Sequence, residues 1–264
     1  MATPKRWAVR EAANVTFYRL ADDTATVPKY SKGDPVVTLN TLKMTDVETS
    51  GETVYARGGR GNAKLVGFSS NREARVTLQD AIFDNSAMAM LTGNDIVTAA
   101  TTVSLYEDLV VDAADKITIT SELDLATTPN IRVYPLSGNV MGEALTVSTD
   151  YSVTGKIITI LDAGVAEGDR YRVYFDATTG ADAQTIKVTA DKFGGTFKVV
   201  ADVLVRDEDT KQDFYGQFIA YNAKIEDNFT FSFSPDGDPS VLDIPLEILK
   251  SPESTNMWEF VIYG

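Results

Sequence analysis

The strongest constraint in this sequence is a strict two-residue alternation of apolar and polar side chains near the C-terminus. Within "VLDIPLEIL" the apolar positions are Leu242, Ile244, Leu246 and Ile248. Asp243 and Glu247 lie between them. Because successive side chains of a β-strand point to opposite faces of a sheet, the segment predicts a strand with one core face and one polar, acidic face.

The same alternation precedes this strand and recurs through much of the chain. "NFTFSFS" places Thr230 and Ser232 on the polar face of a predicted strand, and "SPDGDPS" predicts the turn that follows it. Segments rich in β-branched and aromatic residues predict further strands at 34–42, 63–70, 74–83, 102–111, 116–121, 131–136, 169–175, 185–190, 196–206 and 214–226.

One segment has a helical pattern instead. In "DNSAMAMLTG", Asp84 or Asn85 is suited to cap the helix N-terminus, and Gly93 is suited to end it. The apolar side chains between them are Ala87, Met88, Met90 and Leu91. The fold class predicted from these patterns is mainly β, with one short helix.

Composition argues against the common enzyme classes. The 264 residues include no histidine and no cysteine, which excludes a Ser-His-Asp triad, a thiol nucleophile and a thiolate or imidazole metal site. We therefore expect no enzyme, no cofactor and no metal site. No stretch is long and apolar enough to cross a bilayer, so we also expect no membrane insertion.

The net charge of −14 constrains contacts with nucleic acid. A surface that binds DNA neutralises phosphates with Lys and Arg, but in this chain acidic residues outnumber Lys and Arg. An acidic wall repels phosphates instead and leaves them mobile.

One motif, "RDEDTKQD" at 206–213, resembles a calcium-binding loop in the spacing of its aspartates. Gln212 stands where such a loop requires glycine, and Phe218 stands where it requires glutamate. We predict a charged hairpin turn between the strands at 196–206 and 214–226.

The middle of the chain is predicted to be an inserted domain. Residues 96–180 are acidic on balance, lie between the turn-like segments "TGND" and "DATTGADA", and contain their own set of short strands, among them "TDYSVTGKIITIL". The predicted organisation is a first part at 1–95, an inserted β-sandwich at 96–180 and a second part at 181–264.

The segment 44–63 is predicted to be a mobile loop. It is rich in glycine and polar residues and contains the basic stretch "ARGGRGNAK", with Arg57, Arg60 and Lys64. The glycine spacing matches neither a P-loop nor a dinucleotide fingerprint. Loops of about twenty residues are uncommon without a function, so we expect these cations to meet an acidic neighbour.

Two stretches carry a resemblance to a known family. "GGRGNAKLVGFSSNREARVTLQDAIFDNSAMAMLTGN" and the late "AKIEDNFTFSFSPDGDPS" resemble the major tail tube proteins of long-tailed bacteriophages. The central "TDYSVTG" and "AGVAEGDRYRVYF" resemble small immunoglobulin-like β-modules inserted in phage virion proteins. Together the two resemblances cover most of the chain.

The resemblance implies a fold and a function. The fold would be two packed antiparallel sheets with a flanking helix, and six copies would close into a ring that stacks into a tube in the virion tail. Residues at 44–63, with Arg57, Arg60 and Lys64, would order against the adjacent ring. Partners would be other copies of the chain, a tape measure protein, tail-end or baseplate proteins and, in a contractile tail, a sheath protein.

The same resemblance implies a bore through which DNA passes without specific binding. Its expected lining residues are Asp243, Glu247, Thr230 and Ser232. Assembly would take place in the cytoplasm of the host bacterium.

Two other interpretations are open at this point. A head-tail joining or capsid decoration protein would use the same β-rich composition, but its rings would not polymerise. A carbohydrate-binding module is the alternative from another class, with exposed tyrosines stacking on sugars. The candidate tyrosines are Tyr134, Tyr151, Tyr171 and Tyr174.

Overall fold

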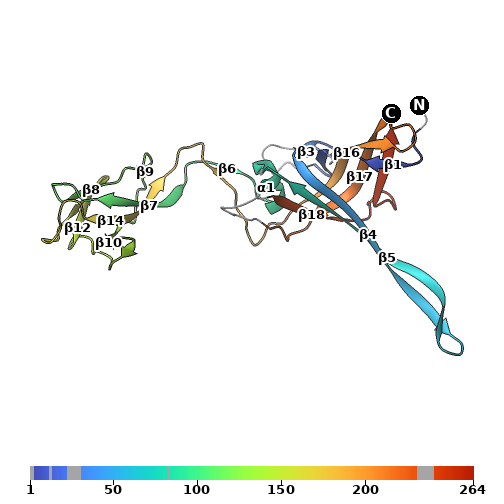
Figure 1. The fold of residues 1–264 in the computed structure, drawn as a ribbon, viewed down its shortest axis with the longest axis horizontal. Coiled ribbons are helices and arrows are strands. Elements are labelled where there is room, and N and C mark those ends of the chain that lie inside the picture. Colours follow the sequence, from blue (N-terminus) through green and yellow to red (C-terminus); the bar gives the residue numbers. More distant parts are fainter. Residues whose placement is uncertain (1–2, 12–13, 23–30, 83, 231–240) are drawn as a thin grey trace. The chain divides into compact units, whose positions relative to one another are not determined.

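The structure, a computed structural model, describes residues 3–11, 14–22, 31–82, 84–230 and 241–264. The chain divides into two compact units: Val97–Thr185 forms one, and Met1–Ile96 with Ile186–Gly264 forms the other. Antiparallel strands dominate both units, and the described part contains one α-helix (Figure 1). The predicted mainly β fold is therefore confirmed.

The first unit consists of one nine-stranded sheet and the helix. Its elements are β1 (Trp7–Val9), β2 (Asn14–Arg19), β3 (Pro35–Leu39), β4 (Leu42–Gly58), β5 (Ala63–Asp80), α1 (Asn85–Thr92), β16 (Thr196–Asp207), β17 (Asp213–Ile225), β18 (Leu242–Ile248) and β19 (Trp258–Tyr263). The main strand order is β3-β2-β16-β17-β18-β5-β4, and β1 and β19 extend it by pairing with β16 and β17.

The connection between β3 and β4 forces this sheet to curve. The two strands are the opposite ends of the seven-strand path, yet only Asn40 and Thr41 separate them in the chain. The connection from Leu39 to Leu42 can span at most roughly 11 Å. A flat sheet would hold its end strands roughly 29 Å apart. The layers expected from the sequence are thus facing walls of one strongly curved sheet.

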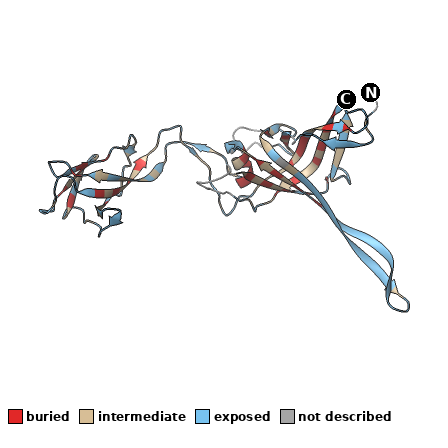
Figure 2. Cartoon of the chain, in the orientation of Figure 1, coloured by how far each residue is buried: buried red, intermediate tan, exposed pale blue. Residues whose placement is uncertain are grey.

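A hydrophobic core fills the concave side of this sheet. Side chains from β2, β3, β5, β16, β17, β18 and α1 contribute to a single buried cluster. The four apolar residues of β18 are each at most 2% exposed, while Asp243 is half-buried and Glu247 is exposed (Figure 2). The alternation predicted for this strand is confirmed.

Helix α1 has the predicted caps. The Asp84 carboxylate accepts a hydrogen bond of 2.7 Å from the Ser86 amide, and Gly93 adopts the left-handed conformation with φ of 66°. Ala87, Met90 and Leu91 are buried against the sheet. A Cβ on Gly93 would lie 2.1 Å from the carbonyl oxygen of Phe193, so backbone packing also requires glycine there.

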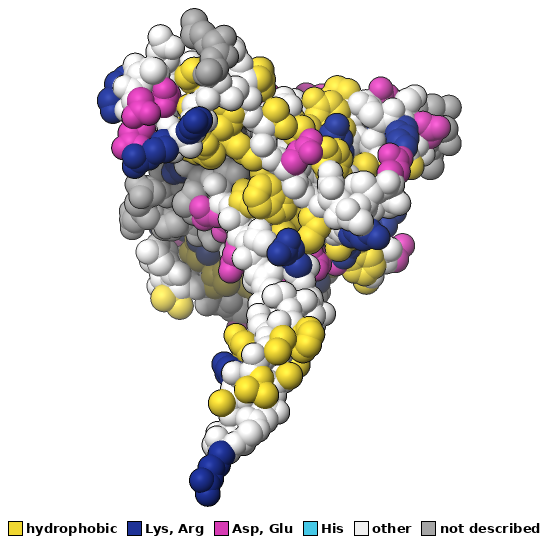
Figure 3. All heavy atoms as spheres, turned by 90° about the vertical axis from the view of Figure 1, so that its right-hand side faces the viewer, with side chains coloured by type: hydrophobic (Ala, Val, Ile, Leu, Met, Phe, Trp, Pro, Cys, Tyr) yellow, Lys and Arg dark blue, Asp and Glu magenta, His cyan; other side chains and the backbone are white. Residues whose placement is uncertain are grey.

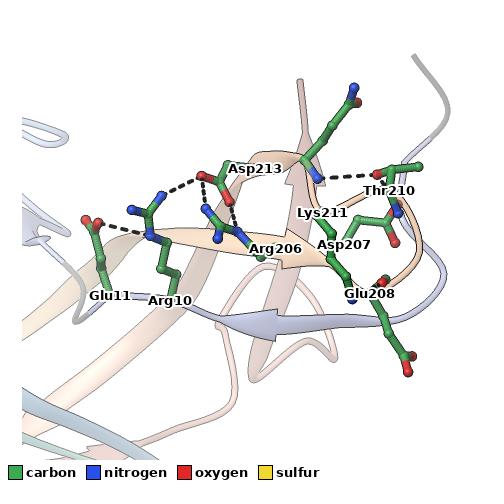
Figure 4. A network of polar contacts seen from close by, with 9 residues as sticks. Arg10, Glu11, Arg206, Asp207, Glu208, Thr210, Lys211 and Asp213 are labelled. Carbon is green, nitrogen blue, oxygen red and sulfur yellow. Dashed lines mark hydrogen bonds and ion pairs between the residues drawn. The ribbon is translucent and has the colours of Figure 1, made fainter.

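The turn between β16 and β17 is held by ion pairs (Figure 4). Asp213 accepts two hydrogen bonds from Arg206, at 2.6 and 2.8 Å, and one of 2.5 Å from Arg10, which follows β1. The Arg206 guanidinium, and to a lesser extent Arg10, lowers the pKa of Asp213 to about 2. The network joins the N-terminal strand to this turn.

The predicted hairpin turn in "RDEDTKQD" is confirmed. β16 and β17 pair in register up to Arg206 opposite Asp213, and the Asp207 carboxylate accepts hydrogen bonds from Thr210 and from the amide of Asp209 within the turn. In the described ranges no group of three or more acidic side chains is placed to hold a metal ion.

The second unit has two main sheets that share one core. Its strands are β6 (Val97–Thr98), β7 (Thr102–Val110), β8 (Lys116–Thr118), β9 (Asp124–Leu125), β10 (Arg132–Ser137), β11 (Val140–Met141), β12 (Tyr151–Thr154), β13 (Ile157–Ile160), β14 (Arg170–Thr178) and β15 (Gln184–Thr185). β11-β10-β14-β7 with β9 form one sheet and β12-β13-β8 form the other. The motif "TDYSVTGKIITIL" forms the β12–β13 hairpin, whose Tyr151, Ile158 and Ile160 are buried in this core.

Replacing Gly93 by alanine is expected to lower the free energy of unfolding of the first unit by about 3 kcal/mol, because overpacking adds to left-handed strain. Gly33→Ala is the matched control: Gly33 has φ of 91°, but no atom of the described residues lies within 4 Å of the methyl group that alanine would add. The control should lose only about 1 kcal/mol. Both tryptophans, Trp7 and Trp258, lie in the first unit, so urea titration followed by their fluorescence measures it. Equal losses would contradict the steric argument.

Asp213→Asn is expected to lower the melting temperature at neutral pH. Because the pKa of Asp213 is lowered in the folded state, its contribution is complete above the unfolded pKa near 4 and is lost as the pH falls toward 2. The difference between wild type and variant, measured by circular dichroism melts, should therefore shrink across that range. Asp209→Asn removes the same charge from the same turn but breaks no ion pair within the described part of the chain, so it should show little difference at any pH. A pH-independent effect of Asp213→Asn would refute the linkage.

Candidate assembly interface

The most exposed feature of the first unit is a β-hairpin formed by the outer halves of β4 and β5. We call residues 50–73 the arm. Cross-strand pairing runs without a large gap from Ser50 opposite Glu73 to Gly58 opposite Ala63, and almost every side chain along it is exposed (Figures 1 and 2). The arm projects from the body of the sheet.

The arm corrects the prediction of a loop at 44–63. These residues form most of β4, and the turn is confined to residues 59–62. The physical reason is that Thr, Val and Tyr favour strands and that cross-strand pairing satisfies the backbone hydrogen bonds that a bare loop would leave to water.

One face of the arm is apolar and has no cover within the described residues. Val54 lies opposite Phe68, and Ala56 lies opposite Val66, on the same face. Val54, Val66 and Phe68 are 62%, 53% and 59% exposed. Such a contiguous apolar strip is typical of a protein–protein contact.

The tip of the arm is basic. Arg57 and Lys64 lie opposite each other, and Arg60 lies in the turn between them, so the structure brings the three predicted cations together. The Lys64 ammonium lies 4.0 Å from the centre of the Tyr55 ring. Figure 3 shows the basic tip and the apolar side chains behind it. Residues 53–72 contain four Lys and Arg and no acidic residue, in a chain with a net charge of −14.

The polar face of β18 is acidic, as the sequence predicts. Asp243 lies opposite Gln79, and Glu247 lies opposite Arg75 on one side and Lys224 on the other. One carboxylate oxygen of Asp243, Oδ1, is buried and has no hydrogen-bond partner among the described residues. Glu247 borders a hollow of about 320 Å³ that is also lined by glutamates of β4, β5 and the segment after β17 (Glu48, Glu73 and Glu226).

The structure does not place Thr230, another predicted lining residue, in a strand of this face. Thr230 is exposed and lies in irregular backbone after the end of β17. The strand predicted in "NFTFSFS" is therefore not formed at Phe229 and Thr230. Ser232 lies outside the described residues.

Within the described chain, the two end strands of the main path each have one unpaired edge. β4 pairs with β5 alone, and β3 pairs with β2 alone. An unpaired edge presents free amide and carbonyl groups and can accept a strand of another chain. Sequence reasoning did not find these edges, because strand order depends on long-range pairing that local alternation does not record.

The tyrosines considered for sugar binding divide into two groups. Tyr151 and Tyr171 are 3% and 6% exposed and belong to the core of the second unit. Tyr134 and Tyr174 are partly exposed on the outer face of its larger sheet. The aromatic residues that sequence reasoning grouped together thus have separate roles.

Comparison with known proteins identifies the chain. None of the curated proteins matches it. Within the described residues no helix has the length and apolar character needed to cross a membrane. The sequence matches the YomU/Tube protein family over residues 8–260, a range that includes the arm, the acidic strand β18 and the whole second unit. The chain therefore belongs to the YomU/Tube protein family and is a structural tube protein of a bacteriophage virion.

Proposed function

We propose that this chain forms the tail tube of a long-tailed bacteriophage, as hexameric rings that stack around the path of the DNA. The observation that carries the proposal is the arm, a paired hairpin with a basic tip and an apolar face that no described residue covers. A monomer gains nothing from such a projection, whereas a stacked assembly requires one. The role needs no catalytic group and no cofactor.

The partner that best suits the arm is a second copy of the same chain. Four basic residues and no acidic ones lie at 53–72, which leaves a net charge of −18 on the rest of the molecule. The body of a neighbouring copy is therefore the complementary surface for Arg57, Arg60 and Lys64. In this proposal the charges align the arm, and burial of Val54, Val66 and Phe68 stabilises the contact.

The open edges of the sheet support ring closure. If β4 of one copy pairs with β3 of the next around the ring, the sheets join into a continuous barrel and the edges of β3 and β4 are no longer exposed. A closed ring repeats one contact, so the two different edges make a head-to-tail interface that cyclic symmetry can close.

The polar face of β18 is our candidate for the wall of the bore. Asp243 and Glu247 would repeat around the ring. Phosphates passing within a Debye length of about 8 Å would be repelled and kept from binding the wall. DNA would pass without specific binding.

Other tail components would contact the tube at defined places. A tape measure protein would lie in the bore before DNA enters, tail-end or baseplate proteins would meet the first ring, and a sheath protein would surround a contractile tail. Assembly in the host cytoplasm completes this proposal.

Replacing residues 51–72 by Asn-Gly tests the role of the arm. The pair Ser50 and Glu73 would then flank a two-residue turn of the favoured type, so the rest of the sheet keeps its pairing. The expected product is a folded protein that forms no tubes in negative-stain electron microscopy. Normal tubes from this variant would refute the proposed role of the arm.

Charge variants of the tip provide the matched control. Reversing Arg57, Arg60 and Lys64 to glutamate should prevent polymerisation, whereas Arg57→Lys with Arg60→Lys keeps the charge and should permit it. The reversed variant should recover partly at high salt, because screening weakens the new repulsion. Rings that never stack, in the wild type, would favour a head-tail joining or decoration protein instead.

Glu247→Lys tests the bore. Glu247 is exposed, so the change should leave the fold intact, and virions that carry it should eject DNA more slowly because each ring gains cations that bind phosphate. The defect should lessen as salt increases. Glu143→Lys makes the same charge change at an exposed position of the second unit and should leave the ejection rate unchanged. Unaltered ejection from assembled Glu247→Lys tails would reject the assignment of this face to the bore.

A further inference from the structure

The outer face of the larger sheet in the second unit carries a cluster of three tyrosines. β7 contributes Tyr106, β14 contributes Tyr174 and β10 contributes Tyr134. The ring centres of Tyr106 and Tyr174 are 5.7 Å apart, and those of Tyr134 and Tyr174 are 5.8 Å apart. Tyr106 is 60% exposed, so this cluster is not part of the core. We call it the tyrosine face.

A hollow of about 550 Å³ lies on the tyrosine face and has polar groups at its border. Asp176 accepts hydrogen bonds of 2.6 Å from Ser104 and from Asn130, and the first of these, followed by the second, lowers the pKa of its carboxyl group. The carboxylate therefore stays ionised at neutral pH, is held in one orientation, and retains lone pairs for further donors.

Arg132 is the cation of this hollow that is available to a ligand. It is exposed and lies opposite Tyr174 in the pairing of β10 and β14, and its side chain makes no ion pair or hydrogen bond within the described part of the chain. Arg172, in contrast, donates two hydrogen bonds to Asp108, at 2.6 and 2.8 Å, while its guanidinium lies 5.0 Å from the Tyr106 ring. The ion pair of Arg172 with Asp108 therefore holds the guanidinium in place beside the Tyr106 ring.

The charge distribution singles out the same surface. Residues 97–185 contain thirteen acidic and five basic residues, and three of the five basic residues, Arg132, Arg170 and Arg172, lie on the tyrosine face. Arg170 and Arg172 both contact Asp108, so Arg132 is the cation of this face that remains to pair with an anionic group of a ligand.

We propose that the tyrosine face binds an acidic saccharide. Sugar rings stack on Tyr106 and Tyr174 through their apolar faces, and their hydroxyl groups donate to Asp176 and accept from Asn130. The carboxylate or phosphate group of the saccharide pairs with Arg132. Rigid aromatic surfaces with a few fixed polar groups are what a weakly hydrophobic, hydroxyl-rich ligand requires.

A single strand of nucleic acid is the competing ligand, because bases also stack on tyrosine. Its backbone needs several cations along one groove. Here Arg170 and Arg172 both face Asp108, which leaves Arg132 alone, and Asp176 would repel a neighbouring phosphate. The face therefore favours a saccharide with widely spaced acidic groups.

Isothermal titration of the full-length protein with hexagalacturonate tests the proposal, with maltohexaose as the neutral saccharide and a ten-residue oligothymidylate as the nucleic acid. Hexagalacturonate should bind, and maltohexaose should bind about tenfold more weakly, because it lacks the charge-assisted bond to Arg132. Arg132→Gln should remove most of this difference between the two saccharides. Tyr106→Ala should weaken both by about fivefold or more.

Tyr215→Ala is the matched control, because Tyr215 is 62% exposed on a strand of the first unit and should not affect either saccharide. Circular dichroism melts of each variant confirm folding. Absence of hexagalacturonate binding, an affinity unchanged by Tyr106→Ala, or tighter binding of the oligothymidylate would overturn the proposal. The contacts proposed for tube formation do not use this face, so either result leaves the proposed function to be decided by the arm variants.

Discussion

The two-residue connection between β3 and β4 is the constraint on which the rest of the first unit depends. It joins the opposite ends of a seven-strand path, and a sheet can meet that demand only by curving until its ends approach each other. Curvature gives the sheet an inside, which takes the apolar side chains of β18, and an outside, which takes Asp243 and Glu247. The closure is incomplete, and it leaves β3 and β4 with one free edge each in the described chain.

The arm exists because β4 and β5 continue beyond the part of the sheet that covers the hydrophobic core. Once the two strands pass Thr49 and Ala74, no core lies beneath them, and cross-strand pairing is the interaction that keeps them ordered. The arm therefore has two faces available to a partner. Its positive charge in a chain of −14 would separate two tasks in the proposed tube: the arm would attract copies of the chain, and the remaining surface would repel DNA.

The parts of this structure that sequence predicted are those in which local pattern and burial agree. β18 alternates strictly because one face is buried, and the caps of α1 are readable because Asp84 and Gly93 each satisfy a local backbone requirement. The second strand of the arm was predicted at 63–70, but its first strand was predicted to be a loop. Neither face of the arm is buried, so Thr49 to Gly58 show no alternation to detect; the remaining signals were the β-propensity of Val54 and Tyr55 and the turn residues at 59–62. Strand order and the tyrosine face depend on pairing between distant segments, which no local pattern contains.

The second unit shows how a large insertion is accommodated without loss of the first core. The first and last residues of the second unit pair with each other: Val97 lies opposite Thr185, and Thr98 lies opposite Gln184. Paired antiparallel residues lie about 5 Å apart, so the insertion begins and ends at nearly one point. The first unit therefore has to close only a short gap between Ile96 and Ile186, and the entropy of the inserted residues is offset within their own core of buried side chains. Because the second unit has its own core, the outer face of its larger sheet can carry a ligand-binding surface that the proposed tube does not require.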